Sequence, residues 1–118
     1  MDFSIDAALQ ADHDRLRAFV RDEIVPLEAD RKNYDSYGNI DMAVLQTLRA
    51  KVKAAGLWAP QIPREQGGLG YGPTGMAVLY EAMNYSIFGP VAFNCAAPDD
   101  GNMYILNKVA TQAQKDRW

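Results

Sequence analysis

The sequence has 118 residues, with 12 basic and 15 acidic side chains, a formal net charge of −3 and 48% hydrophobic residues. This length favours a single domain, and the composition is ordinary for a soluble globular protein. Nucleic-acid binding needs clustered Lys and Arg, and a membrane span needs about 18 consecutive apolar residues. The sequence has neither, which excludes both classes.

The sequence also bears on the compartment of the protein. Residues 1–6 are acidic and lack the apolar run of a signal peptide. A single cysteine, Cys95, cannot form an internal disulfide. A reducing, cytoplasmic setting is therefore expected.

Residues 5–31 predict one long helix, because apolar residues recur at three- and four-residue steps. These residues are Leu9, Leu16, Phe19, Val20, Ile24 and Leu27. Ser4 is the expected N-cap. Pro26 lacks a backbone N–H, so a kink or an early helix end is expected near it. His13, the only histidine, is assigned to the polar side of this helix.

A polar loop over residues 32–40 precedes a second predicted helix over residues 42–55. Asp41 is the expected N-cap, and Gly56 occupies the position where a left-handed residue ends a helix. Residues 57–73 contain three prolines and four glycines and are therefore expected to form no long regular element. Trp58 and Ile62 are expected to anchor this irregular segment on the helices.

Residues 70–75 match the GxGxxG pattern of dinucleotide-binding sites. That pattern requires a preceding buried strand, and here a loop rich in proline and glycine precedes it. Pro73 also removes one of the N–H groups that would face the anion. We therefore expect a glycine loop that enters a third helix over residues 75–86, with Thr74 as its cap.

Residues 87–97 form an apolar stretch of mostly small side chains, in which a short buried helix can follow Pro90. Small side chains allow either close helix packing or space for a ligand, and packing is the commoner outcome. Cys95 is expected to be a buried, unreactive thiol. A further helix is expected to run from a cap at Asp99 or Asp100 to about residue 110. Its inward residues are expected to be Met103, Leu106 and Val109.

Thr111 and Gln114 form a T-x-x-Q capping box, which predicts a last helix that runs to the end of the sequence. Such a short helix is marginal alone, so the sequence is expected to be the front part of a longer chain. We find no catalytic constellation and no metal-ligand cluster in the sequence. Composition and periodicity thus predict an all-α domain, an up-down helical bundle of about five or six helices, whose chemistry is not evident from these patterns.

Four segments of the sequence nevertheless resemble the N-terminal helical domain of the acyl-CoA dehydrogenase family. Residues 21–28 resemble its first helix with a proline near the end, and residues 48–60 its second helix and exit. Residues 63–70, P-R-E-Q-G-G-L-G, resemble its P-x-x-x-G-G-x-G loop. Residues 97–103 and 111–118 resemble the passage to the flavin-binding β-domain. Residue 110 departs from the pattern, because the family usually has glycine there and this sequence has alanine.

The resemblance covers essentially residues 1–118 and implies that the flavin-binding β-domain and the C-terminal helical domain are absent. The family implies FAD in the full-length enzyme, an acyl-CoA substrate and a trans-2-enoyl-CoA product of fatty acid metabolism. It also implies a homo-oligomer, and electron-transfer flavoprotein as the electron acceptor. The motif at residues 97–103 looks most like a subgroup that acts on longer or unusual acyl-CoAs. No catalytic, cofactor-binding or metal-binding residue is carried over, because the base and the flavin contacts lie in the absent domains.

The resemblance does imply a substrate-binding role for this domain, as part of the wall of the acyl-chain pocket. An ungapped alignment back from residues 114–115 places the pocket-facing positions at Phe93, Asn94, Ala97, Pro98 and Gly101. The 118-residue chain alone is expected to be inactive and to retain no FAD. The alternative function is a free-standing helical interaction module derived from this domain.

Overall fold

The structure, a computed structural model, describes residues 4–118, so half of the acidic segment 1–6 lies outside the described residues. Helices account for all the regular structure of this part of the chain, and the one β-type pairing in it is an isolated bridge between Tyr34 and Ile40. The helices are α1 (Ala7–Phe19), α2 (Val25–Glu28), α3 (Met42–Ala54), α4 (Pro73–Met83), α5 (Gly89–Ala92), α6 (Asp99–Val109) and α7 (Gln112–Arg117). The predicted all-α helical fold is thereby confirmed.

The first predicted helix is interrupted by a π-helical turn, Val20–Ile24, which separates α1 from α2. The Val25 N–H donates to the Val20 carbonyl, five residues earlier, just before Pro26. Pro26 has no N–H to offer the preceding turn, so a local change of helical pitch is expected there. The helix ends at Glu28, three residues before the predicted end.

Two assignments on this helix were wrong. The N-cap is Asp6 rather than Ser4, because the Asp6 carboxylate accepts from the N–H groups of Ala8 and Leu9. His13 is buried instead of lying on a solvated face. His13 lies at the boundary between the apolar stripe and the polar face of the helix. Its exposure therefore depends on how neighbouring elements pack against it, and helix periodicity alone does not predict that packing.

Helix α3 begins and ends as its sequence predicts. The Asp41 carboxylate accepts from the N–H groups of Ala43 and Val44, and Gly56 has a φ angle of 67° in the left-handed region. The buried residues of α3 are Leu45, Leu48 and Val52. Its exit segment is anchored as expected, because Ile62 is buried and Trp58 packs partly buried against the core.

Helix α4 begins two residues before its predicted start. Gly72 is the N-cap and Pro73 occupies the first turn, where a missing N–H costs nothing. Thr74 is therefore not the cap, which corrects that prediction. Met76, Leu79, Ala82 and Met83 are buried, as their spacing predicts.

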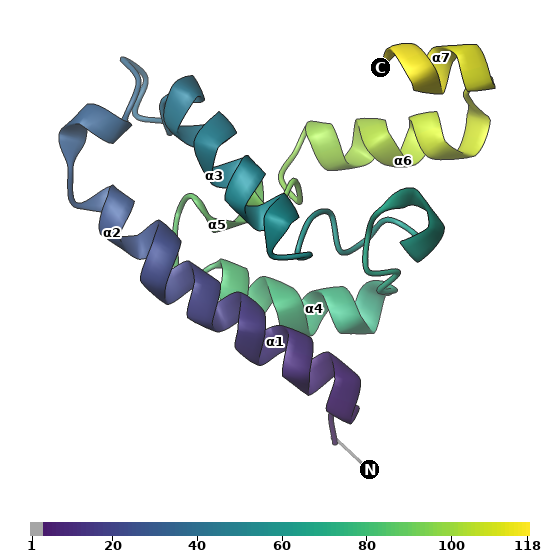
Figure 1. Cartoon of the computed structure of the whole chain (residues 1–118), viewed down its shortest axis with the longest axis horizontal. Coiled ribbons are helices and arrows are strands. Elements are labelled where there is room, and N and C mark those ends of the chain that lie inside the picture. Colours follow the sequence, from purple (N-terminus) through teal and green to yellow (C-terminus); the bar gives the residue numbers. More distant parts are fainter. Residues whose placement is uncertain (1–3) are drawn as a thin grey trace.

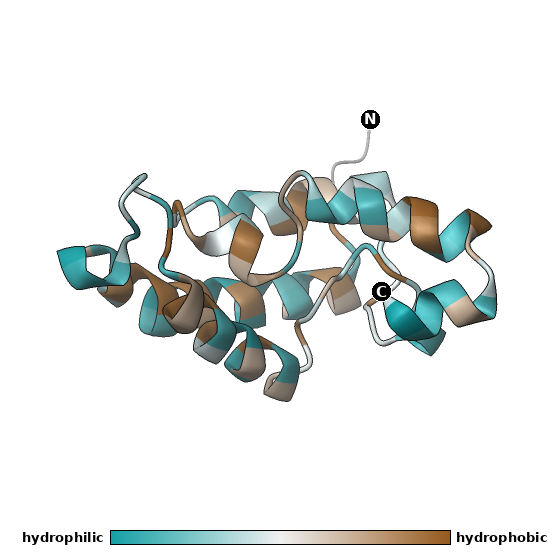
Figure 2. Cartoon of the chain, turned by 90° about the horizontal axis from the view of Figure 1, so that it is seen from above, coloured by the Kyte–Doolittle hydropathy of each residue, from teal (hydrophilic) through white to brown (hydrophobic). Residues whose placement is uncertain are grey.

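The core lies between α1, α3, α4 and α5 (Figure 1). Helices α1 and α4 pack side by side along much of their length, and α5 lies behind α3. Helices α6 and α7 form a hairpin at the edge of the molecule, and no residue of α6 or α7 is fully buried. Figure 2 shows hydrophobic residues on α6 even at this edge.

The start of α6 differs from its prediction. Pro98 precedes the first turn, and Asp99 and Asp100 lie inside it without a side-chain cap bond. Val109 is 76% exposed rather than inward, whereas Met103 and Leu106 are partly buried. The capping box of Thr111 and Gln114 is present and begins α7.

Within residues 4–118, no helix is both long and apolar enough to cross a membrane.

Candidate functional site

Two hollows flank the base of α6. One has a volume of about 820 Å³ and lies between α6, the N-terminal part of α4 and the loop before α4. The other has about 800 Å³ and lies between α6, α3 and the end of the chain. We name them the Tyr80 hollow and the Trp58 hollow after one residue that lines each.

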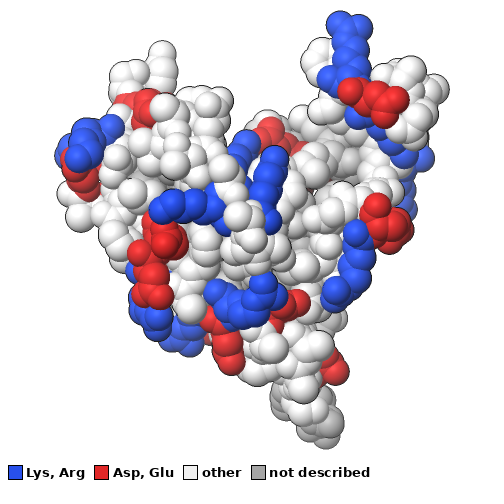
Figure 3. Space-filling view, viewed as in Figure 1, with Lys and Arg blue, Asp and Glu red and all other residues white. Residues whose placement is uncertain are grey.

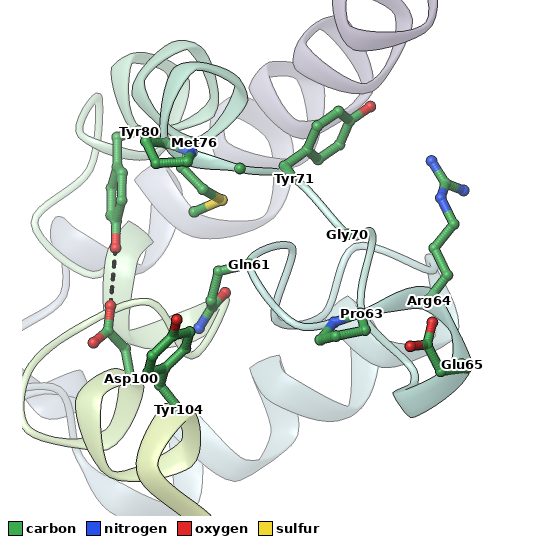
Figure 4. Close-up of a pocket in the computed structure, with 12 residues that line it drawn as sticks. Gln61, Pro63, Arg64, Glu65, Gly70, Tyr71, Met76, Tyr80, Asp100 and Tyr104 are labelled. Atoms are coloured by element: carbon green, nitrogen blue, oxygen red, sulfur yellow. Dashed lines mark hydrogen bonds between the residues drawn. The ribbon is translucent and has the colours of Figure 1, made fainter. Parts of the chain in front are cut away.

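The Tyr80 hollow is bordered by pairs of residues one helical turn apart. Met76 and Tyr80 come from α4, and Asp100 and Tyr104 come from α6. Such i, i+4 pairs lie on one helix face, so each helix presents one apolar or aromatic residue and one polar group to the same space. Figure 4 shows Tyr80 and Asp100 pointing toward one another across this hollow.

Tyr80 is a hydrogen-bond donor at the floor of this hollow. Its hydroxyl donates to the Cys95 carbonyl at 2.6 Å and lies 3.4 Å from the Asp100 carboxylate. Burial, the neighbouring Cys95 and the Asp100 charge raise the pKa of Tyr80 to about 12. The hydroxyl therefore keeps its proton and remains a donor at neutral pH.

The Trp58 hollow is built around cations stacked on an indole. The Lys53 Nζ lies 4.3 Å from the centre of the Trp58 ring, and the Arg49 guanidinium lies 5.6 Å from it. The Arg49 guanidinium also donates to the Val91 carbonyl at 3.1 and 3.2 Å and lies 3.4 Å from the Asp99 carboxylate. Arg49 thus joins α3 to both α5 and α6.

The chain between the two hollows is held by Gln61. The Gln61 amide donates to the Asn94 carbonyl at 2.9 Å, and its oxygen lies 3.2 Å from the Cys95 Sγ. Cys95 is buried, and burial together with the Asp100 charge raises the pKa of its thiol to about 12. The thiol is accordingly protonated at neutral pH, as the sequence predicts for an unreactive cysteine.

The structure separates the five predicted substrate-binding residues into two sets. Phe93 and Asn94 are buried; Phe93 belongs to the core, and Asn94 lines the Trp58 hollow with a left-handed φ of 61°. Ala97, Pro98 and Gly101 are exposed at the start of α6. No atom lies within 4 Å of the position that a Cβ would occupy at Gly101.

Sequence reasoning missed the residues that connect α6 to the body of the domain, namely Arg49, Gln61 and Tyr80. Their partners lie 15 to 50 residues away in the chain. The i, i+4 spacing of Met76 with Tyr80 and of Asp100 with Tyr104 is a local signal that could have found part of the Tyr80 hollow.

The visible surface carries basic and acidic side chains in alternation rather than in a field of one sign (Figure 3). The chain has several exposed ion pairs, such as Lys51 with Glu23 at 2.6 Å and Lys32 with Asp30 at 2.7 Å. Among residues 4–118, no three His, Cys, Asp or Glu side chains come together as metal ligands would.

The glycine motif at residues 70–75 does not form a dinucleotide site. A 3₁₀ turn, Arg64–Gln66, and loop residues precede it in place of a strand, and Pro73 contributes no N–H to the start of α4. The adjacent Tyr80 hollow also contains the carboxylates of Glu65 and Asp100. These carboxylates would repel a pyrophosphate group.

Comparison with known proteins gives one consistent family. The model of the acyl-CoA dehydrogenase N-terminal domain matches residues 7–118. FadE2 of Mycobacterium tuberculosis, which carries an acyl-CoA dehydrogenase name, is 35% identical over all of this chain and 30% of its own length. Acyl-CoA dehydrogenase family member 10 of Mus musculus is 33% identical over 90% of this chain and 11% of its own length.

A solved structure with an acyl-CoA dehydrogenase name, from Mycobacterium abscessus, has the same fold. It superposes with a TM-score of 0.80 at 33% identity and matches 98% of this chain and 31% of its own. The chain therefore spans less than a third of the length of these relatives.

Proposed function

Because the chain belongs to the acyl-CoA dehydrogenase family as its N-terminal domain, we propose that it forms the first helical domain of an FAD-dependent acyl-CoA dehydrogenase. The full-length enzyme would oxidise the bond between the α and β carbons of an acyl-CoA thioester to give a trans-2-enoyl-CoA. The proposal is supported by relatives with dehydrogenase names, one of which matches this chain over its whole length. None of the relatives described above favours a free-standing interaction module.

Within that enzyme, the start of α6 would form part of the wall of the acyl-chain pocket. Support comes from the exposure of Ala97, Pro98 and Gly101 and from the free space above Gly101. Small exposed residues in the turn before α6 and in its first turn leave room for an apolar chain to lie against the backbone. Phe93 would support this wall from the core, and Asn94 would hold its base next to Met103, to whose sulfur the Asn94 amide donates.

The glycine motif and the Tyr80 hollow do not fit the pyrophosphate of a flavin dinucleotide, for the reasons given above. FAD would therefore be held by parts of the protein outside these 118 residues, together with the catalytic base. The 118-residue chain alone is predicted to lack activity. After purification and dialysis, the 118-residue chain should show no flavin absorbance. Retained flavin would contradict the proposal that other parts of the protein hold FAD.

The partners follow from the same proposal. The full-length protein would bind acyl-CoA, pass electrons to an electron-transfer flavoprotein and form a homo-oligomer. A cytoplasmic location is expected. Reduction of purified electron-transfer flavoprotein by the full-length protein and acyl-CoA tests the first two expectations together.

The wall assignment is tested by filling the space beside α6. In the full-length protein, Ala97→Trp or Gly101→Trp should raise KM or shift the preferred acyl-chain length, because a bulky ring would occupy the pocket. Tyr37→Trp is the control, since Tyr37 is 89% exposed in the loop before α3. An unchanged chain-length profile in both α6 variants would exclude this wall.

A further inference from the structure

Helix α6 lacks the apolar anchoring that holds the other long helices. None of its residues is buried, whereas α1, α3 and α4 each have two or more buried residues. Tyr104, Ile105 and Val109 are all more than half exposed. Besides the partly buried Met103 and Leu106, the orientation of α6 therefore depends on polar contacts at its base.

Two hydrogen-bond donors from different helices contact the base of α6. Arg49 of α3 binds the Val91 carbonyl and pairs with Asp99. Tyr80 of α4 binds the Cys95 carbonyl and approaches Asp100. Arg49 thus holds a carbonyl of α5 and a carboxylate of the first turn of α6. The single Tyr80 proton is donated to the Cys95 carbonyl in the segment that leads into α6, and the Asp100 carboxylate is its more distant neighbour.

The two carboxylates lie about 100° apart around the helix axis, because they are consecutive residues in a helix of about 3.6 residues per turn. The Trp58 hollow lies on the side of Asp99, and the Tyr80 hollow lies on the side of Asp100. A helix held on two sides cannot tilt toward one donor without lengthening its contact with the other. An exposed ion pair alone contributes little, but each donor here is already fixed by a carbonyl hydrogen bond.

We propose that Arg49 and Tyr80 are positioning residues that set the tilt of α6 and, through it, the acyl-chain length that the enzyme accepts. The second half of this inference rests on the proposed dehydrogenase function. Neither side chain needs to touch the substrate. Their effect passes through the segment that they hold between Cys95 and the first turn of α6, which carries Ala97 and Pro98 and leads into Gly101.

Another role for Asp99 and Asp100 has to be separated from this one. Acidic residues in a first turn also stabilise a helix through its dipole. Removal of the donors leaves both carboxylates in place, so the contribution of the helix dipole is retained while the donor contacts are lost. The informative variant is Arg49→Met with Tyr80→Phe, which retains most of the side-chain volume at both positions.

The chain offers a matched control. Arg15 donates to the Ala55 carbonyl at 2.7 Å, and Tyr34 donates to the Glu28 carbonyl at 2.9 Å, both away from α6. Arg15→Met with Tyr34→Phe makes the same chemical changes and removes carbonyl hydrogen bonds of the same kind. A general loss of stability would appear in both double variants.

The first measurement is hydrogen exchange of residues 4–118 within the full-length protein, which does not depend on any enzyme activity. Amides of residues 99–109 should exchange at least about fivefold faster in the Arg49/Tyr80 variant, while those of α1 and α3 are unchanged. The control variant should leave exchange in residues 99–109 as in the wild type. Equal exchange of these residues in the Arg49/Tyr80 variant and the wild type would overturn the positioning role.

The second measurement is kcat/KM of the full-length protein over acyl-CoAs of increasing length. The ratio between the longest and shortest good substrates should change by about tenfold in the Arg49/Tyr80 variant, mainly through KM, because one methylene in a pocket is worth about that much. The control should keep the wild-type ratio, and an unchanged ratio in the Arg49/Tyr80 variant overturns the specificity role. A wild-type protein inactive on every acyl-CoA would instead refute the proposed function and, with it, the specificity role, while hydrogen exchange still decides the positioning role.

Discussion

Phe19 and Phe93 meet edge to face, with ring centroids 5.8 Å apart and ring planes inclined by 65°. This contact joins the end of α1 to the segment that leads into α6. Phe93 is completely buried, so its side chain fills the core beneath the proposed wall. Phe93→Ala should therefore lower the free energy of unfolding by about 3–5 kcal/mol, the range for a deleted buried aromatic ring.

Urea unfolding of Phe93→Ala against Phe93→Leu measures this effect, since leucine refills much of the space and should lose markedly less. If alanine and leucine cost the same small amount, the ring would not be a core element. Loss of activity at Phe93 would then bear directly on the pocket.

Gly89 and Gly101 should respond in opposite directions to alanine. A Cβ at Gly89 would overlap the Met83 carbonyl oxygen, whereas a Cβ at Gly101 would meet open space. We expect Gly89→Ala to destabilise the fold by about 3 kcal/mol through steric overlap. Gly101→Ala should stabilise it by about 0.5–1 kcal/mol, because alanine costs less entropy inside a helix.

Thermal melting of both variants checks this contrast. A destabilised Gly101→Ala would show that a neighbour occupies the space beside α6. A neutral Gly89→Ala would show that α5 can move away from the end of α4.

The stability of the fold should fall in alkaline solution partly because of Tyr80. The pKa of this tyrosine is raised from 10.0 to about 12 by burial and by its neighbours Cys95 and Asp100. Between these values the folded chain keeps a proton that the unfolded chain has released. The stabilisation from this group is therefore complete below pH 10 and is lost as the pH rises toward 12.

Urea midpoints at pH 9 and pH 11 measure the change. The drop should be smaller in Tyr80→Phe than in the wild type. An identical drop in Tyr80→Phe would assign the alkaline sensitivity to other groups, such as Tyr71, whose pKa is also raised to about 12.

The N-cap of α3 offers a test of local helix stability. The Asp41 carboxylate accepts from two backbone N–H groups at 2.9 and 3.3 Å. Asp41→Ala should cost about 1 kcal/mol, because it leaves these donors without an acceptor from the cap. Asp41→Asn should lose much less, since asparagine caps as well; equal losses would point to charge rather than the cap as the cause.

The features that sequence predicted well are decided within a few residues. Asp41 and Gly56 delimit α3 because a cap and a left-handed glycine act on the adjacent turn alone. The capping box of Thr111 and Gln114 likewise depends only on residues of the adjacent turn. The prediction of Thr74 as the cap of α4 was wrong because Pro73 favours the first helical turn, which places the cap at Gly72.

The features that sequence could not supply depend on distant neighbours. Val109 has inward spacing on α6, yet no element covers it within the described chain. Arg49 and Asp99 are separated by 50 residues, and Tyr80 and Asp100 by 20. Helical periodicity contains no information about which charged or hydroxyl groups from different helices meet, so the base of α6 became visible only in three dimensions.

The α6–α7 hairpin has a mechanical consequence. Helix α7 is fastened back onto α6 by the Lys115 ammonium group, which donates to the Asn107 carbonyl at 2.7 Å, and the capping box fixes the bend between them. The 11 residues of α6 span about 16 Å. A small rotation of the hairpin about Asp99 and Asp100 is therefore amplified at its far end. A rotation of about 10° at that pivot would carry the far end of the hairpin through about 3 Å.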